Sequence, residues 1–207
     1  MSAFLETICI LDGHPRYLDW HQRRVDATLR HFYPDQPIEE ITFSLSDILS
    51  SCDIPANGLF RCRIIYDINA IDIEFFTHEP RLVNSLCLIE APAGYDYGYK
   101  YADRKVLEAL FAQRGDAVDI LITRKGWITD TSIANIAFRK DHRWYTPSIP
   151  LLAGTTWKRL VVTGHLIPRP IHQLDVHRYD AYKLFNAMND WDTIGELPVS
   201  SINTSLF

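Results

Sequence analysis

Lysine is scarce in this sequence, and there is no excess of positive charge. The chain has 207 residues, and its 21 lysines and arginines are outnumbered by 26 aspartates and glutamates, which gives a net charge of −5. A mildly acidic chain lacks the electrostatic footprint that nucleic-acid binding requires. The one group of basic residues on or near a single predicted helix is Arg16, Arg23, Arg24 and Arg30. We therefore expect no nucleic-acid partner.

Long hydrophobic runs and metal-ligand patterns are also absent. No apolar stretch approaches the roughly 18–20 residues of a membrane span, and the N-terminus has no basic region followed by an apolar one, as a signal peptide would. The eight histidines lack the spacing of zinc ligands. No Cys-x-x-Cys pair occurs among Cys9, Cys52, Cys62 and Cys87, which favours free thiols. These absences predict a cytoplasmic protein with no membrane association and no metal.

The composition is that of a globular protein, with 47% hydrophobic and 23% charged residues. At roughly 100–200 residues per domain, the length fits one large domain or two small ones. A stretch with one proline and two glycines, Pro92–Tyr99, interrupts the pattern and is the best candidate for an interdomain connection. We predict a small N-terminal lobe over residues 1–94 and a larger one over 95–207. Antiparallel hairpins mixed with single helices indicate an α+β fold.

Apolar periodicity gives the expected elements of each lobe. Asp19 is the predicted N-cap of a helix that Pro34 ends, and Asp103 is the predicted cap of a helix that Gly115 ends. Two further helices are expected over 46–51 and 155–162. The expected strands are 4–11, 16–18, 58–66, 70–77, 84–91, 119–123, 127–129, 134–139, 144–146, 181–186 and 193–200.

Of the six lysines, Lys100 has the most unusual position. It lies between the Gly- and Tyr-rich connection and a predicted helix start, at the predicted junction of the lobes. Sites for cofactors gather in such clefts. A lysine near a positive helix end and aromatic walls has a depressed pKa and can act as an amine nucleophile. The alternative is an exposed linker lysine.

Two polar segments in the second lobe also suggest chemistry. Residues 129–132, Thr-Asp-Thr-Ser, stand between two core strands and form either a simple turn or a set of donors and one carboxylate aimed into a cleft. In Leu151–Thr156, a glycine precedes two hydroxyl side chains at a helix start. Free N–H groups at a helix N-terminus bind phosphate. The alternative is N-capping by Thr155 or Thr156.

Taken in order along the chain, these segments resemble the class IV aminotransferases. These are fold-type-IV enzymes that use pyridoxal 5′-phosphate (PLP), and they include branched-chain and D-amino-acid aminotransferases and aminodeoxychorismate lyase. The resemblance implies two α+β lobes with the cofactor in the cleft between them, and a homodimer. It is carried by His21-x-x-Arg24-Val, Lys100-x-x-x-Arg104, Asp119-Ile-Leu-Ile, Gly126-Trp-Ile-Thr-Asp-Thr-Ser-Ile-Ala-Asn135, Tyr145-Thr-Pro147 and Leu151-Leu-Ala-Gly-Thr-Thr156.

The resemblance also implies a role for each matching residue. Lys100 would be the catalytic residue and form the Schiff base with PLP, and Arg24 would hold the phosphate. Asp130 falls where the family usually has a glutamate bonded to the pyridine nitrogen, with Asn135 holding the turn. The remaining implied cofactor contacts come from Ser132, Leu152, Thr155 and Thr156.

The resemblance leaves the reaction open. The favoured prediction is transamination between a small amino acid and a 2-oxo acid. The alternatives are an aminodeoxychorismate-lyase-like β-elimination that releases pyruvate, and a non-enzymatic binding protein on the same scaffold. The last alternative arises because Asp130 is shorter than glutamate and because Trp157 replaces the family's usual arginine.

Overall fold

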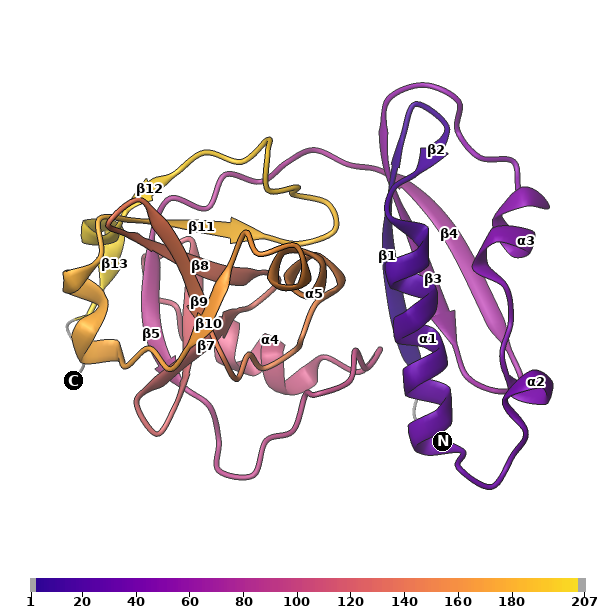
Figure 1. The fold of residues 1–207 in the computed structure, drawn as a ribbon, viewed down its shortest axis with the longest axis horizontal. Helices are drawn as coiled ribbons and strands as arrows, with labels where there is room; N and C mark the ends of the chain where they lie inside the picture. Colours follow the sequence, from indigo (N-terminus) through magenta and orange to yellow (C-terminus); the bar gives the residue numbers. More distant parts are fainter. Residues whose placement is uncertain (1–2, 205–207) are drawn as a thin grey trace. The chain divides into compact units, whose positions relative to one another are not determined.

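The computed structural model of the protein describes residues 3–204. These residues form two compact units (Figure 1). The first contains the residues up to Pro80 together with Tyr99–Asp103, and the second contains Arg81–Gly98 and the residues from Arg104 onward. The chain enters the second unit at Arg81, returns to the first unit at Tyr99 and leaves it again after Asp103. Lys100 therefore belongs to the first unit.

The first unit is built on a four-stranded antiparallel sheet in the order β2-β1-β3-β4. Its three helices contribute their buried side chains to a single core cluster, in which Val25 and Leu29 pack with Ile8 and Ile64. Side chains alternate across a strand, so the other set of strand residues, among them Leu5 and Arg61, lies on the opposite face. The elements are β1 (Phe4–Leu11), β2 (His14–Pro15), α1 (Leu18–Phe32), α2 (Ile38–Ile41), α3 (Leu45–Ser50), β3 (Leu59–Tyr66) and β4 (Ile71–Thr77).

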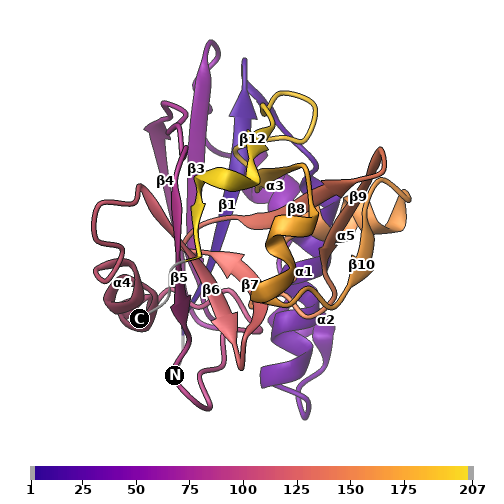
Figure 2. The ribbon, with the colours of Figure 1, turned by 90° about the vertical axis from the view of Figure 1, so that its left-hand side faces the viewer.

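The second unit is built on a larger, mixed sheet in the order β10-β9-β8-β7-β6-β5-β13, with β11 beside β8 and β12 beside β11. Strands β5 to β10 of this sheet are labelled in Figure 2. The parallel pairs are β5 with β6, β5 with β13 and β9 with β10. The strands are β5 (Leu86–Glu90), β6 (Asp119–Arg124), β7 (Trp127–Thr131), β8 (Asn135–Lys140), β9 (Arg143–Pro147), β10 (Ile167–Arg169), β11 (Ala181–Phe185), β12 (Leu197–Pro198) and β13 (Ile202–Asn203). The helices are α4 (Lys105–Phe111), α5 (Thr155–Val162) and the 3-10 turns η1 (Gln173–Arg178) and η2 (Val199–Ser201).

The mixed sheets and helices confirm the predicted fold class, and α5 has the predicted bounds. Both predicted acidic caps were wrong. The N-cap of α1 is Tyr17, which adopts a left-handed φ of 53° where the chain turns from β2 into the helix, and the N-cap of α4 is Arg104. Neither helix has a side-chain cap.

Two predicted strands also differ from the structure. The return strand after β1 is β2 at His14–Pro15, earlier than the predicted 16–18, because the Asp12-Gly13 turn is tight. In the predicted strand 193–200, residues 193–196 form no strand, Leu197–Pro198 pairs with β11, and the residues from Val199 onward belong to η2. Among the described residues, no helix is both long enough and apolar enough to span a membrane.

Candidate functional site

The hairpin of β7 and β8 positions Asp130. Asp130 and Asn135 are Cα partners across the two strands, and a short turn between them is closed by Thr131. The backbone N–H of Thr131 donates to the carbonyl of Ala134 at 2.9 Å, and the Ala134 N–H donates to Oγ1 of Thr131 at 3.1 Å. The polar segment therefore builds a turn and also presents a buried carboxyl group, since Asp130 is only 5% exposed.

The Asp130 carboxyl group is held by two different donors. Its Oδ1 accepts a hydrogen bond from Asn135 Nδ2 at 2.7 Å, and its Oδ2 accepts one from the backbone N–H of Leu152 at 2.8 Å. Burial raises its pKa to about 7, although these hydrogen bonds and one from the Leu151 backbone act in the opposite direction. Near neutral pH this carboxyl group is therefore poised to pair with a cationic N–H donor.

Helix α5 begins beside Asp130 with an uncapped N-terminus. Its N-cap is Gly154, which has no side chain, so the predicted alternative of N-capping by Thr155 or Thr156 was wrong. The backbone N–H of Lys158 is the first to reach back, bonding to the Gly154 carbonyl at 2.9 Å. The N–H groups of the preceding turn have no acceptor within the helix, and this arrangement binds anions.

Asn135 links the buried carboxyl group to this helix start. Besides Asp130, its amide donates to the Leu152 carbonyl at 2.9 Å. A Cβ atom added at Gly154 would collide with Asn135 Oδ1, so only glycine fits there without a shift. The structure thus brings Asp130, Leu152 and the buried pair Thr155 and Thr156 together in the second unit.

Ser132 and Trp157 have additional contacts in the same unit. The Ser132 carbonyl accepts a hydrogen bond from Arg104 Nη2 at 2.8 Å. The arginine of the segment Lys100-x-x-x-Arg104 is therefore bonded to the turn after Asp130. The indole of Trp157 donates to Thr146 Oγ1 at 3.1 Å and packs on the core cluster that contains Leu160. The position of the family's usual arginine is therefore used for packing.

A second group of ionisable residues lies in the first unit around Glu6. The fully buried Glu6 carboxylate accepts hydrogen bonds from Arg24 Nε at 2.7 Å and Arg24 Nη2 at 2.6 Å, and it lies 2.6 Å from His21 Nδ1. Burial alone would raise the pKa of Glu6, but Arg24 and His21 lower it to about 2. Burial lowers the pKa of His21.

Sequence reasoning missed Glu6. The signal was a single acidic residue on the buried, alternating side of β1, between Phe4 and Ile8. A buried carboxylate there needs a cation, and α1 supplies Arg24.

Lys100 lies beside β1 in this same unit. The Leu5 N–H donates to the Lys100 carbonyl at 2.8 Å, and Phe4 and Tyr101 form an antiparallel bridge. The positive charge of Lys100 is close enough to contribute to the lowered pKa of His21, after burial and Arg24. The first unit therefore contains both Arg24 and Lys100.

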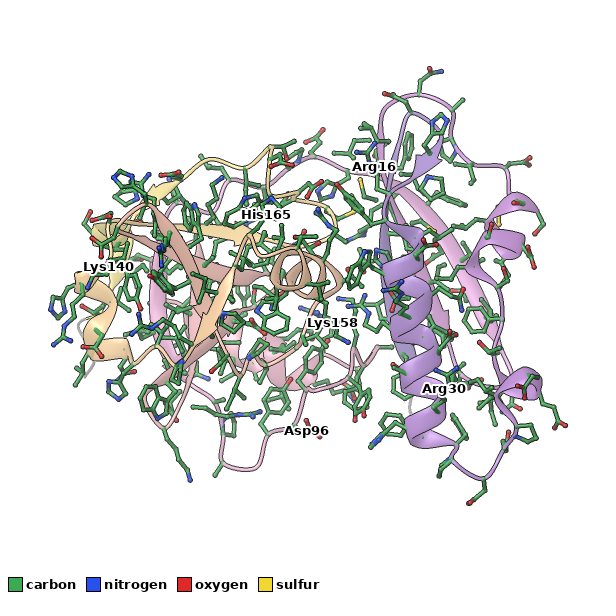
Figure 3. The ribbon with its side chains drawn as sticks, in the orientation of Figure 1. Arg16, Arg30, Asp96, Lys140, Lys158 and His165 are labelled. Carbon is green, nitrogen blue, oxygen red and sulfur yellow. The ribbon has the colours of Figure 1, made fainter. Side chains whose placement is uncertain are left out.

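The arginines of the α1 region do not form one basic face. Figure 3 shows Arg16 and Arg30 near opposite ends of α1, and Arg24 is buried against Glu6. The guanidinium of Arg23 lies over the ring of Trp20. Among residues 3–204, no group of three or more His, Cys, Asp or Glu side chains is arranged to hold a metal ion.

Comparisons with known proteins identify one family. The model of the family described as amino-transferase class IV matches residues 3–202. An uncharacterised protein of Haemophilus influenzae is 34% identical over 189 residues, which cover 91% of this chain and 99% of the relative. The crystal structure of a "putative 4-amino-4-deoxychorismate lyase" from Haemophilus somnus 129pt superposes with a TM-score of 0.82 at 32% identity, covering 92% of this chain and 98% of its own.

More distant matches also cover most of the chain. The aminodeoxychorismate lyase of Bacillus subtilis is 23% identical over 224 residues, covering 94% of this chain and 74% of the relative. A PLP-bound structure of a hypothetical aminotransferase from Mycobacterium tuberculosis superposes with a TM-score of 0.70 at 16% identity, covering 98% of this chain and 82% of its own, and this similarity supports the fold alone.

Proposed function

The chain belongs to the class IV aminotransferase family, and from this membership we propose that it binds PLP and transfers an amino group between a small amino acid and a 2-oxo acid. The observation that carries the proposal is the arrangement of Asp130, Leu152 and the start of α5. A buried carboxyl group and an uncapped helix N-terminus, joined through Asn135, match the two ends of a pyridine ring that bears a phosphate.

The residues present fit the cofactor chemically. Asp130 has a raised pKa and would keep a proton on the ring nitrogen by pairing with it. The Leu152 side chain would pack on the ring, and Ser132 is a further contact proposed from the family resemblance. The N–H of Thr155 and the hydroxyl of Thr156 would bind the phosphate, together with the Arg24 guanidinium.

When bound, the cofactor supplies an electron sink for the bonding electrons left on the substrate Cα. Lys100 would hold the cofactor covalently through Nζ and, once displaced by substrate, would move a proton from the substrate Cα to C4′ of the cofactor. The reversible transfer of one proton by one amine suits both directions of a transamination.

A lyase reaction is the alternative that a specific observation supports. The Haemophilus somnus structure, at 32% identity, and the Bacillus subtilis relative are both described as aminodeoxychorismate lyases. Removal of the same Cα proton by Lys100, followed by loss of a leaving group at Cβ, would release pyruvate. A homodimer is the assembly that we propose with either reaction.

One assay separates these functions. The protein, reconstituted with PLP, is incubated with a panel of D- and L-amino acids and with aminodeoxychorismate. Pyridoxamine phosphate formed from an amino acid supports transamination, and pyruvate released from aminodeoxychorismate supports the lyase. Stable PLP binding with neither product would contradict both enzymatic proposals and favour the non-enzymatic alternative.

A further inference from the structure

One arginine side chain joins the two ends of the short segment that carries Lys100. The chain leaves the second unit after Gly98 and enters it again at Arg104. The Arg104 guanidinium donates through Nη2 to the Ser132 carbonyl at 2.8 Å and, more weakly, through Nη1 to the Tyr97 hydroxyl at 3.4 Å. Tyr97 precedes the departure and Arg104 follows the return. The base of the segment is therefore closed within the second unit.

The backbone of Arg104 is fixed by the start of α4. Arg104 is the N-cap of this helix, and its carbonyl accepts the N–H of Glu108 at 2.8 Å. Leu107 and Leu110 bury the same helix against the rest of the unit. A guanidinium is always charged and presents its donors in a rigid fork. From this fixed backbone, the Arg104 side chain can therefore serve two acceptors at once.

The acceptor of the shorter bond belongs to the turn that follows Asp130. Ser132 is buried, and a buried backbone carbonyl needs a donor. The next carbonyl of the turn, that of Ile133, accepts from Asn186 Nδ2 at 3.1 Å. Arg104 supplies the donor for Ser132, so its side chain fixes the end of the Lys100 segment to the turn that presents Asp130.

Between its two ends, the segment is paired with β1 of the first unit. The Leu5 N–H donates to the Lys100 carbonyl at 2.8 Å, and the Ala102 N–H donates to the Ala3 carbonyl at 2.9 Å. Lys100 lies four positions before Arg104, and a chain of that length spans at most about 14 Å. The point at which Arg104 fixes the chain therefore limits where the Lys100 amine can go.

We propose that Arg104 is a positioning residue, which fixes the Lys100 segment so that the lysine amine meets the aldehyde of a cofactor held by Asp130. The inference rests on the proposed function, in which one PLP molecule contacts both residues. Attachment joins Nζ of neutral Lys100 to the aldehyde carbon as a C=N bond and releases one water. Preorganisation raises the effective concentration of such an amine, and loss of the Arg104 hydrogen bonds lowers it.

A double-mutant cycle on PLP affinity tests this role. The dissociation constant of PLP is measured by equilibrium dialysis for the wild type, Arg104→Met, Lys100→Ala and the double variant. Methionine keeps an unbranched side chain but has no donor. We expect Arg104→Met to weaken PLP binding about 10-fold, as loss of a charge-assisted hydrogen bond does. In the Lys100→Ala background, the same substitution should change the affinity by less than about twofold, because the residue that Arg104 positions is gone.

A purely structural role predicts a different pattern. If Arg104 only supports the turn after Asp130, Arg104→Met will weaken PLP binding equally in both backgrounds, and this result would overturn the proposal. Unchanged affinity in Arg104→Met would also overturn it. Arg104→Lys keeps one charged donor for the Ser132 carbonyl and should recover part of the affinity. No recovery in a lysine variant that melts at the wild-type temperature would contradict the role of this hydrogen bond.

Arg114→Met is the matched control. Arg114 also lies in the second unit and donates through Nη1 to a backbone carbonyl, that of Phe111, at 3.2 Å. This bond stays within one turn of the chain and does not involve the Lys100 segment. The variant should therefore keep PLP affinity within about twofold in both backgrounds. A loss equal to that of Arg104→Met would show that any buried arginine of this unit has the same effect, which would overturn the proposal.

Hydrogen exchange distinguishes failure of this proposal from failure of the proposed function. In the protein without PLP, Arg104→Met should speed exchange of the Leu5 and Ala102 amides about 10-fold, because the segment opens more easily once its base is released. The Lys158 amide of α5 should exchange at the wild-type rate. A wild type that binds no PLP would refute the proposed function, and faster exchange would still support fixation of the segment by Arg104. Unchanged exchange would overturn that fixation whether or not PLP binds.

Discussion

The side-chain amide of Asn135 donates a hydrogen bond of 2.7 Å to Oδ1 of Asp130. The same amide donates to the Leu152 carbonyl at 2.9 Å, and the Leu152 N–H donates to Asp130 Oδ2 at 2.8 Å. These three hydrogen bonds close a ring between β7, β8 and the segment before α5. The direction of the carboxyl group is therefore fixed by backbone and side chain together, as a contact with a ring nitrogen requires.

Replacing Asn135 by alanine should weaken both this ring and cofactor binding. The change leaves Asp130 Oδ1 and the Leu152 carbonyl without their donor, and losing a buried partner costs about 1–3 kcal/mol. We expect the free energy of unfolding in urea to fall by that amount and PLP to bind more weakly. Asn69→Ala, at an exposed turn position, is the control and should change neither quantity. Unchanged PLP affinity in Asn135→Ala would contradict the role assigned to the ring.

Gly154→Ala should damage the start of α5 for a steric reason. The added Cβ would overlap Asn135 Oδ1, so either the helix start or the Asn135 side chain must move. Overpacking of this kind costs about 1–3 kcal/mol, and we expect a lower melting temperature and weaker binding of PLP. Gly195→Ala is a matched control, because a Cβ there has nothing within 4 Å and needs no unusual φ. Equal melting temperatures and equal PLP affinities of Gly154→Ala and Gly195→Ala would contradict this prediction and show that the site tolerates the added Cβ atom.

Part of this site was predictable from the sequence because the relevant patterns are local. A polar segment between two apolar strands indicated Asp130, and a glycine followed by two threonines indicated the helix start. The contact that joins them was not predictable, because Leu152 lies 22 residues from Asp130 and their hydrogen bond depends on the packing of the sheet.

The errors have a similar cause. Asp19 and Asp103 are of a residue type that often caps helices. The chain, however, enters α1 and α4 in conformations set by the hairpin and by the unit as a whole. Tyr17 and Arg104 therefore occupy the N-cap positions. Glu6 was overlooked because a strand pattern shows which residues face the core but not which distant residue neutralises a charge there. Its partner Arg24 is 18 positions away.

Glu6→Gln should remove an acid-sensitive part of the stability. The pKa of Glu6 is lowered from its ordinary 4.5 to about 2. A carboxylate with a lowered folded pKa stabilises the protein above its unfolded pKa, and that stability is lost as the pH falls through the folded pKa. The difference corresponds to roughly 3 kcal/mol. We expect the wild-type protein to exceed Glu6→Gln in stability at pH 7, and the gap to close between about pH 5 and pH 2.

Urea unfolding of both proteins at several pH values checks this expectation. Glu74→Gln is the control, because its salt bridge with Arg63 is exposed and contributes little. A constant gap between wild type and Glu6→Gln from pH 7 to pH 2 would show that the carboxylate charge is not what Arg24 and His21 stabilise.

Lys100→Ala should abolish turnover while leaving measurable PLP binding. The proposed phosphate contacts of Thr155, Thr156 and Arg24 remain in this variant, and only the covalent attachment and the proton transfer are lost. Borohydride reduction of the wild-type protein followed by peptide mapping should place the cofactor on Lys100. Lys105→Ala, on the neighbouring helix, should retain activity. A label on Lys105 or Lys183 would contradict the assignment of the whole segment.

Asp130→Asn should have two effects. It should change how the stability of the apo protein depends on pH, and it should weaken the electron sink of the loaded protein without releasing the cofactor. In the protein without cofactor, burial raises the pKa of Asp130 from 3.8 to about 7. An acid whose folded pKa is raised lowers stability progressively as the pH rises from its unfolded pKa through its folded one. Unfolding experiments on the apo protein should therefore show a loss of stability between about pH 4 and pH 7 that Asp130→Asn lacks. The Glu6 effect has the opposite sign, because there stability is lost as the pH falls, and it extends to lower pH, so the two effects can be separated.

With PLP bound, a cationic ring nitrogen beside Asp130 stabilises the carboxylate, and each charge favours the other. Asparagine can still contact the ring nitrogen but cannot keep it protonated, so kcat should fall steeply while PLP remains bound. Asp130→Glu tests the reach of the side chain. If the ring sits close enough for aspartate, glutamate is too long and activity falls; if a water bridges the gap, glutamate displaces it and activity is kept or rises. Full activity in Asp130→Asn would refute a role for this carboxylate in catalysis and would leave the anion site at α5 as the part of the proposal that still stands.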